Sequence, residues 1–182
     1  MPRVAVIGSA GAGKSTFAKD LGLRLAIDVI HLDHLYWRPG WVPAHASDWR
    51  ALQLALVGRP DWVIDGNYGA TLDVRLRAAD MVVFFDVPRR VALAGILRRW
   101  VTNRGRDVQA PGCPERLDWS FLRWAWRYPR DSRPRVLAAL QAHCSSAEVI
   151  VIRSRREARE VLGRVRPLHG RRDAGQSSRA TS

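Results

Sequence analysis

The stretch Gly8-Ser-Ala-Gly-Ala-Gly-Lys-Ser15 decides how the rest of this sequence is interpreted. It fits a phosphate-binding pattern, in which two glycines separated by four residues precede a lysine and a hydroxyl residue. The apolar run Arg3–Ile7 before it predicts a strand, and regularly spaced apolar residues after it predict a helix over Lys14–Ala26. Glycines let backbone N–H groups converge on phosphate oxygens, and the helix N-terminus adds partial positive charge. A glycine-rich turn without a ligand would leave Lys14 opposed to the helix dipole, so we expect a phosphate ligand here.

The residue types in this loop predict their roles. Lys14 is expected to reach the β- and γ-phosphates of a nucleotide, and Ser15 is expected to hold Mg²⁺. ATP and Mg²⁺ are therefore the predicted ligands. The predicted nucleotide-binding residues are Gly8, Ser9, Ala10, Gly11, Ala12, Gly13, Lys14, Ser15 and Thr16.

Strand-like and helix-like segments alternate along the chain. The strand-like runs are Arg3–Ile7, Val29–Leu32, Trp62–Ile64, Met81–Asp86 and Val149–Ile152. Helical patterns lie at Lys14–Ala26, from an N-cap at Ser47 to Gly58, at Thr71–Ala79, at Arg89–Thr102, after Pro134, and after a capping box at Ser154 and Glu157. Nearly continuous apolar runs are typical of strands buried on both faces. The alternation predicts an α/β fold, a three-layer α/β/α sandwich of the P-loop NTPase type with a five-stranded parallel sheet and a short lid.

The length of 182 residues suits one domain, which we expect over residues 1–165. Residues 103–118 are rich in glycine and proline without any period, and we expect them to form the lid. Residues 166–182 are rich in Gly, Ser and Arg, and we expect a basic disordered tail there.

The formal net charge is +13, and all but two of the basic residues are arginines. Eight of the excess positive charges lie in Arg89–Arg135 and four in Arg164–Ser182. A basic excess attracts polyanions. The first stretch therefore favours a lid that closes over polyphosphate, and a nucleic-acid surface is the alternative.

Acidic residues at the predicted strand ends are candidates for the same site. Asp65 is expected to close the strand beside the loop strand and to contact Mg²⁺, usually through water, whereas Asp86 is expected to be a strand-end residue. Asp33 follows the second strand and is expected to accept the proton of an acceptor hydroxyl or to bind Mg²⁺-bound water; the alternative is a loop cap. His31 is expected in the core or as a support, and a metal site formed with His34 is the weaker alternative.

Arginines surround and follow the predicted lid. Planar guanidinium groups stabilise the charge that develops on a transferred phosphoryl group. Arg99 and Arg104 are the predicted catalytic arginines, although a solvated basic face is the alternative for each. The whole group is Arg98, Arg99, Arg104, Arg106, Arg123, Arg127 and Arg130.

Aromatic residues gather in two places. The spacing of Trp119, Leu122 and Trp126 predicts a packing stripe on one helix. Trp37 and Trp41, with Tyr36 before them, follow Asp33. They are expected either to stack on a ring of the acceptor or to pack in the core or a dimer.

Other classes of protein fit poorly. No run approaches the roughly 18 apolar residues of a membrane span, and the first residues lead straight into a strand, so neither a membrane partner nor a secretory signal is expected. Cys113 and Cys144 have no metal-ligand spacing. We expect the reduced cytoplasm as the compartment.

Four segments carry a more specific resemblance. They are Val29-Ile-His-Leu-Asp-His-Leu-Tyr-Trp-Arg-Pro-Gly-Trp41, Trp62-Val-Ile-Asp-Gly-Asn-Tyr68, Gly112-Cys-Pro-Glu115 and Phe121-Leu-Arg-Trp-Ala-Trp126. Over roughly residues 3–165 the chain resembles the bacterial DNA topology modulation proteins, which are relatives of adenylate kinase. The resemblance implies a P-loop kinase-like core with a short lid. Asp65-Gly66 stands where adenylate kinases carry an acid–glycine pair, but Asn67-Tyr68 replaces their aromatic-Pro-Arg and sets this chain apart from kinases of nucleoside monophosphates.

The expected function is therefore Mg²⁺- and ATP-dependent phosphoryl transfer to a small-molecule acceptor, such as a nucleoside, a nucleotide or a hydroxylated metabolite. The alternative is an ATP-binding protein that acts on DNA topology or regulates it, with nonspecific nucleic-acid contacts through its basic face and tail. A nucleotide-sensing switch with slow hydrolysis is a third interpretation.

Overall fold

Five parallel strands form the central sheet of residues 2–165, the part of the chain that this computed structural model describes. They are β1 (Arg3–Gly8), β2 (Val29–His31), β5 (Trp62–Asp65), β6 (Met81–Phe85) and β7 (Glu148–Ile152). Their order across the sheet is β2-β5-β1-β6-β7, and every neighbouring pair is parallel. β5 lies directly beside β1, so Asp65 does close the strand next to the phosphate loop, as predicted. The predicted tail, 166–182, lies outside the described residues.

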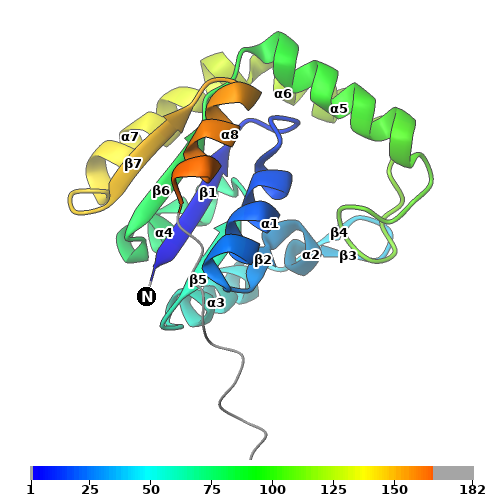
Figure 1. The fold of residues 1–182 in the computed structure, drawn as a ribbon. Coiled ribbons are helices and arrows are strands. Elements are labelled where there is room, and N and C mark those ends of the chain that lie inside the picture. Colours follow the sequence, from blue (N-terminus) through cyan, green and yellow to red (C-terminus); the bar gives the residue numbers. More distant parts are fainter. Residues whose placement is uncertain (1, 166–182) are drawn as a thin grey trace, which may run out of the picture.

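Helices cover both faces of the sheet because its buried residues alternate in direction (Figure 1). One core cluster joins Val4, Val6 and Val83 to α1 (Lys14–Leu25) and α8 (Arg155–Arg164). The other joins Ala5, Ile7 and Phe84 of the sheet to three helices on the opposite face. These are α3 (Ala46–Val57), α4 (Leu72–Ala78) and α7 (Arg133–His143). The predicted three-layer α/β/α sandwich is confirmed.

Two further helices extend beyond the sheet. α5 (Arg89–Asn103) and α6 (Trp119–Asp131) run side by side in Figure 1, and residues 103–118 loop back between them. The short elements α2 (Leu32–Tyr36), β3 (Trp37–Arg38), β4 (Val42–Pro43) and the 3₁₀ turn η1 (Gly69–Thr71) follow the carboxyl ends of β2 and β5. β3 and β4 form an antiparallel hairpin. The elements that depart from the sandwich therefore gather on one side of it.

Two local predictions are wrong. Helix α3 begins at Ala46 with His45 as its cap, and the Ser47 hydroxyl bonds the Asp48 carboxylate inside the first turn rather than capping the helix. The expected packing stripe on α6 is largely in solvent, because Trp119 is 79% exposed and Trp126 is 48% exposed. Ala125 and Tyr128 pack α6 against its neighbours instead. In contrast, the Ser154 cap on α8 is confirmed, since its hydroxyl accepts from the Glu157 N–H at 3.1 Å.

The backbone of α5 touches the phosphate loop directly. A Cβ built on Gly95 would overlap the carbonyl oxygen of Gly11, and one built on Gly11 would overlap the carbonyl oxygen of Ala92. Only glycine at both positions allows this approach. The contact sets how closely α5 lies over the loop.

Gly95→Ala should therefore destabilise the fold, although alanine normally stabilises a helix by about 0.5–1 kcal/mol relative to glycine. We expect the free energy of unfolding in urea to fall by about 1–3 kcal/mol, the cost of overpacking. Gly163 in α8 is the matched control, because its Cβ would meet nothing within 4 Å. Gly163→Ala should hold or raise stability. Equal stabilisation by both substitutions would contradict the close contact.

Candidate active site

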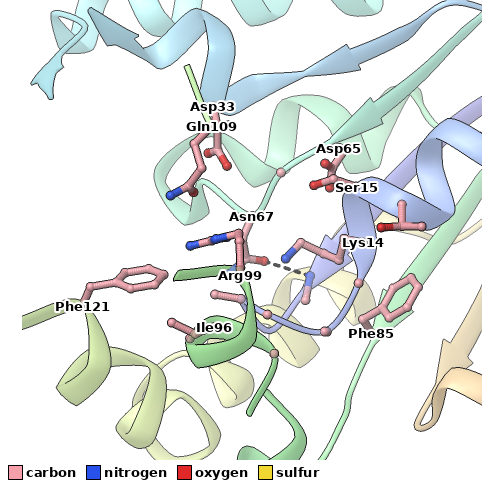
Figure 2. Close-up of a pocket in the computed structure, with 18 of the residues that line it drawn as sticks. Lys14, Ser15, Asp33, Asp65, Asn67, Phe85, Ile96, Arg99, Gln109 and Phe121 are labelled. Atoms are coloured by element: carbon pink, nitrogen blue, oxygen red, sulfur yellow. Dashed lines mark hydrogen bonds between the residues drawn. The ribbon is translucent and has the colours of Figure 1, made fainter. Parts of the chain in front are cut away.

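A single cavity of about 1510 Å³ brings together residues from distant parts of the chain. Its wall includes the phosphate loop, Asp33, Asp65, the β3–β4 hairpin, α5 and part of the 103–118 segment (Figure 2). Of the predicted nucleotide-binding residues, the ones that line it are Gly8, Ala10, Gly11, Ala12, Gly13, Lys14, Ser15 and Thr16. Ser9 is buried and does not line the cavity, and its N–H donates to Phe85 O at 3.1 Å.

The loop has the shape that a phosphate requires. Gly8 has φ 122°, and a Cβ there would overlap the backbone of Phe85, so the turn out of β1 needs glycine. Gly13 has φ 95° and caps α1, and a Cβ there would point into open space. The first residues of α1 line the cavity, and a helix N-terminus with open space before it can bind an anion.

Lys14 is half-buried inside this loop. Its ammonium donates to the carbonyl oxygen of Ser9 at 2.8 Å. Burial lowers the pKa of Lys14, and the Arg99 charge lowers it further, whereas the Asp65 and Asp33 carboxylates act in the opposite direction. An anion bound between Lys14 and Arg99 would relieve the repulsion between them.

Asp65 is buried at the end of β5 and is held by His31. The His31 ring nitrogen Nδ1 lies 3.0 Å from Asp65 Oδ2. Burial by itself would raise the pKa of Asp65, but the His31 hydrogen bond and the Lys14 charge bring it below its ordinary value. His31 therefore supports the carboxylate, in agreement with one of the two roles expected for it.

The residues around Asp65 fit a magnesium ion. Its Oδ1 atom is buried and makes no hydrogen bond of ordinary geometry within the described residues, and the Ser15 hydroxyl lies close by (Figure 2). Mg²⁺ commonly takes only one or two protein oxygens and completes its shell with water and phosphate. No cluster of three or more His, Cys, Asp or Glu side chains suited to a metal exists in residues 2–165, which leaves the His31–His34 alternative without support.

Asp33 faces the cavity from α2, and a tyrosine orients it. The Tyr68 hydroxyl donates to Asp33 Oδ1 at 2.5 Å, and burial together with this carboxylate raises the pKa of Tyr68. Next to it, Asn67 Oδ1 accepts the N–H of Gly8 at 3.2 Å (Figure 2). Asn67 and Tyr68, which mark the departure from adenylate kinases, thus connect the phosphate loop to Asp33.

A buried arginine that the sequence analysis missed shapes this connection. Arg75 on α4 is fully buried and donates to the carbonyl oxygens of Gly66, Asn67 and Tyr68. Burial lowers the pKa of Arg75 to about 10. The one sequence signal was its position on the otherwise apolar face of its helix.

The structure separates the two predicted catalytic arginines. Arg99 lines the cavity, and its Nε donates to Glu115 Oε1 at 3.0 Å. Arg104 does not line it: its guanidinium lies 5.6 Å from the centre of the Trp100 ring. Asp86 is held by Arg133 at 2.7 Å, which is consistent with the strand-end role expected for it.

The aromatic residues after Asp33 also divide into two groups. Tyr36 packs against Trp49 and Tyr68 at ring-centre distances of 4.9 and 4.7 Å. Trp37 and Trp41 line the cavity, with their rings 5.5 Å apart. Tyr36 therefore packs in the core, as one of the two alternatives expected, whereas stacking of Trp37 and Trp41 on an acceptor stays a prediction.

Comparison with solved structures establishes the fold. A shikimate kinase from Acinetobacter baumannii in complex with shikimate matches at 19% identity and a TM-score of 0.57, over 90% of this chain and 89% of that one. A sugar kinase from Janibacter sp. HTCC2649 (18%, 0.53, 90% and 91%) and a gluconokinase from Sinorhizobium meliloti 1021 (17%, 0.53, 90% and 92%) match similarly. The chain has the fold of P-loop kinases.

The sequence comparisons add nothing to this. No protein-family model and no curated protein matches the sequence, so the resemblance to DNA topology modulation proteins stays a prediction. None of the helices in residues 2–165 is long and apolar enough to cross a membrane.

Arg75→Met should lower the free energy of unfolding by about 3 kcal/mol or more, because three carbonyl groups lose a charged donor in a buried setting. Arg50 of α3 is the matched control, since it forms an exposed ion pair with Asp73 of α4. Arg50→Met should cost less than about 1 kcal/mol. Urea denaturation of both variants tests this, and similar losses in the two would contradict the role of Arg75.

Proposed function

We propose that this protein is a Mg²⁺- and ATP-dependent kinase that transfers the γ-phosphate to a hydroxyl group of a small-molecule acceptor. The observation that carries the proposal is that one cavity holds both the phosphate loop with Lys14 and an oriented carboxylate, Asp33, beside an aromatic wall. A site that only binds a nucleotide would not need Asp33 and the aromatic wall. The kinase fold is consistent with this reaction.

Each of these residues has a separate role in the proposed reaction. Lys14 and the loop N–H groups bind the donor phosphates, and Ser15 and Asp65 would hold Mg²⁺, which neutralises phosphate charge when bound. Asp33 accepts the hydroxyl proton of the acceptor while Tyr68 keeps its carboxylate in place. Arg99 stabilises the transferred group, and residues 103–118 act as the lid. Arg104 has no part in this proposal because it lies outside the cavity wall.

The DNA-directed alternative stays a prediction without structural support. Part of the basic charge assigned to it lies in the tail, outside the described residues. Some arginines of the other basic stretch already have partners: Arg127 pairs with Asp131, and Arg133 with Asp86.

The only two lysines offer a matched test of the donor site. Lys14→Ala should abolish detectable transfer from MgATP, because the β- and γ-phosphates lose the cation that the loop holds for them. Lys19→Ala, on the exposed side of α1, should behave as wild type. Transfer is measured with labelled ATP against sugars, hydroxy acids, nucleosides and nucleotides. Turnover that survives Lys14→Ala would refute the proposed site.

The acceptor side is tested separately with Asp33→Asn. We expect the turnover number to fall by about 10²- to 10⁴-fold, the usual contribution of a general base, with ATP affinity nearly unchanged. The exposed Asp28 provides the control substitution Asp28→Asn. A loss of ATP affinity with an unchanged turnover number would place Asp33 on the nucleotide side instead.

A further inference from the structure

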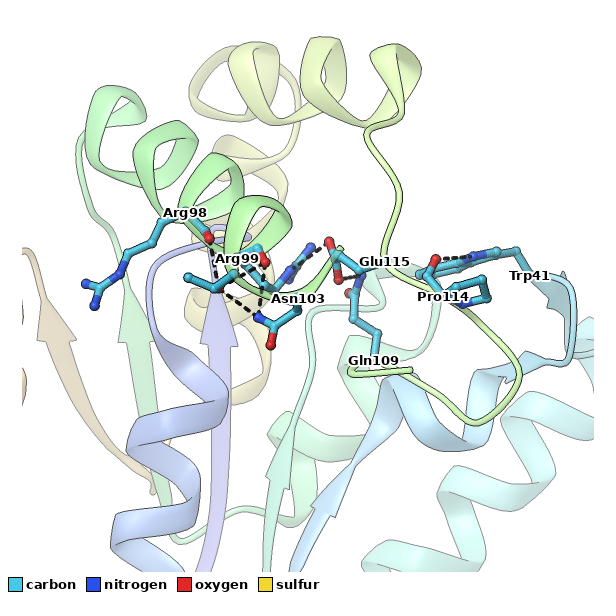
Figure 3. A network of polar contacts seen from close by, with 8 residues as sticks. Trp41, Arg98, Arg99, Asn103, Gln109, Pro114 and Glu115 are labelled. Carbon is cyan, nitrogen blue, oxygen red and sulfur yellow. Dashed lines mark hydrogen bonds and ion pairs between the residues drawn. The ribbon is translucent and has the colours of Figure 1, made fainter. Parts of the chain in front are cut away.

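Glu115 is buried within the 103–118 segment, an unusual place for a carboxylate. Its side chain is 2% exposed, and both of its oxygens accept hydrogen bonds (Figure 3). Oε1 accepts from Arg99 Nε at 3.0 Å, and Oε2 accepts from Gln109 Nε2 at 3.3 Å. Its backbone is held as well, since its N–H donates to Arg106 O at 2.9 Å. Burial of a carboxylate is costly without such partners, so Glu115 and Arg99 constrain each other.

The contact through Nε leaves the two terminal nitrogens of Arg99 for another partner. Within residues 2–165 the Arg99 guanidinium makes no other hydrogen bond. Arg99 lies one helical turn beyond Gly95, the residue that contacts the phosphate loop. The positive charge of Arg99 is close enough to Lys14 to lower the pKa of Lys14. The Glu115 carboxylate therefore holds the Arg99 guanidinium beside the phosphate loop. The two terminal nitrogens of Arg99 are left to bind a ligand.

The residues immediately before Glu115 are attached to the acceptor side. Three hydrogen bonds join them to the β3–β4 hairpin, which follows Asp33 and α2 in the chain. They are Gly40 N–H to Gly112 O (2.8 Å), Cys113 Sγ to Arg38 O (3.2 Å) and Trp41 Nε1 to Pro114 O (3.3 Å). Trp41 also lines the cavity, and Figure 3 shows its contact with Pro114 next to the Glu115 network. A continuous set of contacts thus runs from the acceptor wall to Arg99.

We propose that Glu115 is a positioning residue that orients Arg99 toward the transferred phosphate, and that it does so while the 103–118 segment is seated on the β3–β4 hairpin. The inference rests on the proposed kinase function and deepens it. An acceptor that packs against Trp41 would stabilise the seated segment further.

A cycle of four proteins tests the first part: wild type, Glu115→Gln, Arg99→Met and the double variant. Glutamine keeps the shape of the side chain, but its amide group cannot accept from both Arg99 and Gln109. The probes are MgADP alone and MgADP with aluminium fluoride, a mimic of the phosphoryl group in transfer, titrated by calorimetry. These probes need no knowledge of the acceptor.

We expect aluminium fluoride to increase the affinity of the wild type for MgADP. Glu115→Gln should reduce that tightening by about 10- to 100-fold, as the loss of a charged hydrogen bond does, while the affinity for MgADP alone changes by less than about twofold. The double variant should be no worse than Arg99→Met, because Glu115 acts through Arg99. The control, Glu160→Gln, removes an exposed carboxylate of α8 and should match the wild type.

Other outcomes separate the two proposals. Two results would overturn the role of Glu115 and leave the kinase proposal standing. In the first, Glu115→Gln gains as much MgADP affinity from aluminium fluoride as the wild type does. In the second, the double variant loses the full Glu115→Gln effect in addition to that of Arg99→Met. A wild type that binds no MgADP, or shows no tightening, would overturn both.

Trp41→Phe tests the link to the hairpin, because it keeps an aromatic side chain and removes the N–H that donates to Pro114 O. It should lose part of the tightening, and unchanged binding would disprove the link.

Discussion

The close approach of α5 to the phosphate loop is the constraint on which the rest of the site depends. Two glycines, Gly11 and Gly95, let the two backbones touch, and no side chain separates them. Arg99 follows one turn later on the same helix, so its distance from the loop is set by that contact rather than by its own flexibility. The far end of α5 then leads into the 103–118 segment, which carries Glu115.

Buried charges are concentrated around the cavity, and each has a specific compensation. Asp65 has His31 and the Lys14 charge, Arg75 has three carbonyl oxygens, and Glu115 has Arg99. Replacing a whole buried pair by apolar side chains often costs a fold little, whereas removing one partner leaves the other buried and unpaired at a large cost. Their value here is orientation, because a buried charge tolerates few arrangements of its neighbours.

The two halves of the cavity differ in character. The proposed donor half consists of backbone N–H groups, Lys14 and the Asp65 carboxylate, all held by parallel strands and a helix N-terminus. The proposed acceptor half consists of Asp33, Tyr68 and two tryptophans supplied by short connections. Loops supported by a rigid sheet are where specificity usually lies. Under the proposed function, the identity of the acceptor would therefore depend on these connections.

Much of the fold follows from local patterns. The phosphate loop and the apolar strands were predictable because each depends on a few consecutive residues. The position of Asp65 beside the loop was predictable from the usual strand order of P-loop folds. The predictions were wrong where a local sequence pattern was compatible with more than one arrangement. Ser47 resembles a cap, yet His45 takes the extended conformation before α3, and the tryptophans of α6 have helical spacing but face solvent.

The sequence by itself determined a sheet with a phosphate loop at the end of its first strand and acids at the ends of the second and third. Only the tertiary structure decided which charges meet. It placed Arg99 in the cavity and Arg104 beside Trp100, beyond the end of α5, and it buried Arg75 and Glu115 against partners from other segments. The physical reason is that the position of a charged side chain depends on the partners around it. Here those partners come from separate turns and segments of the chain.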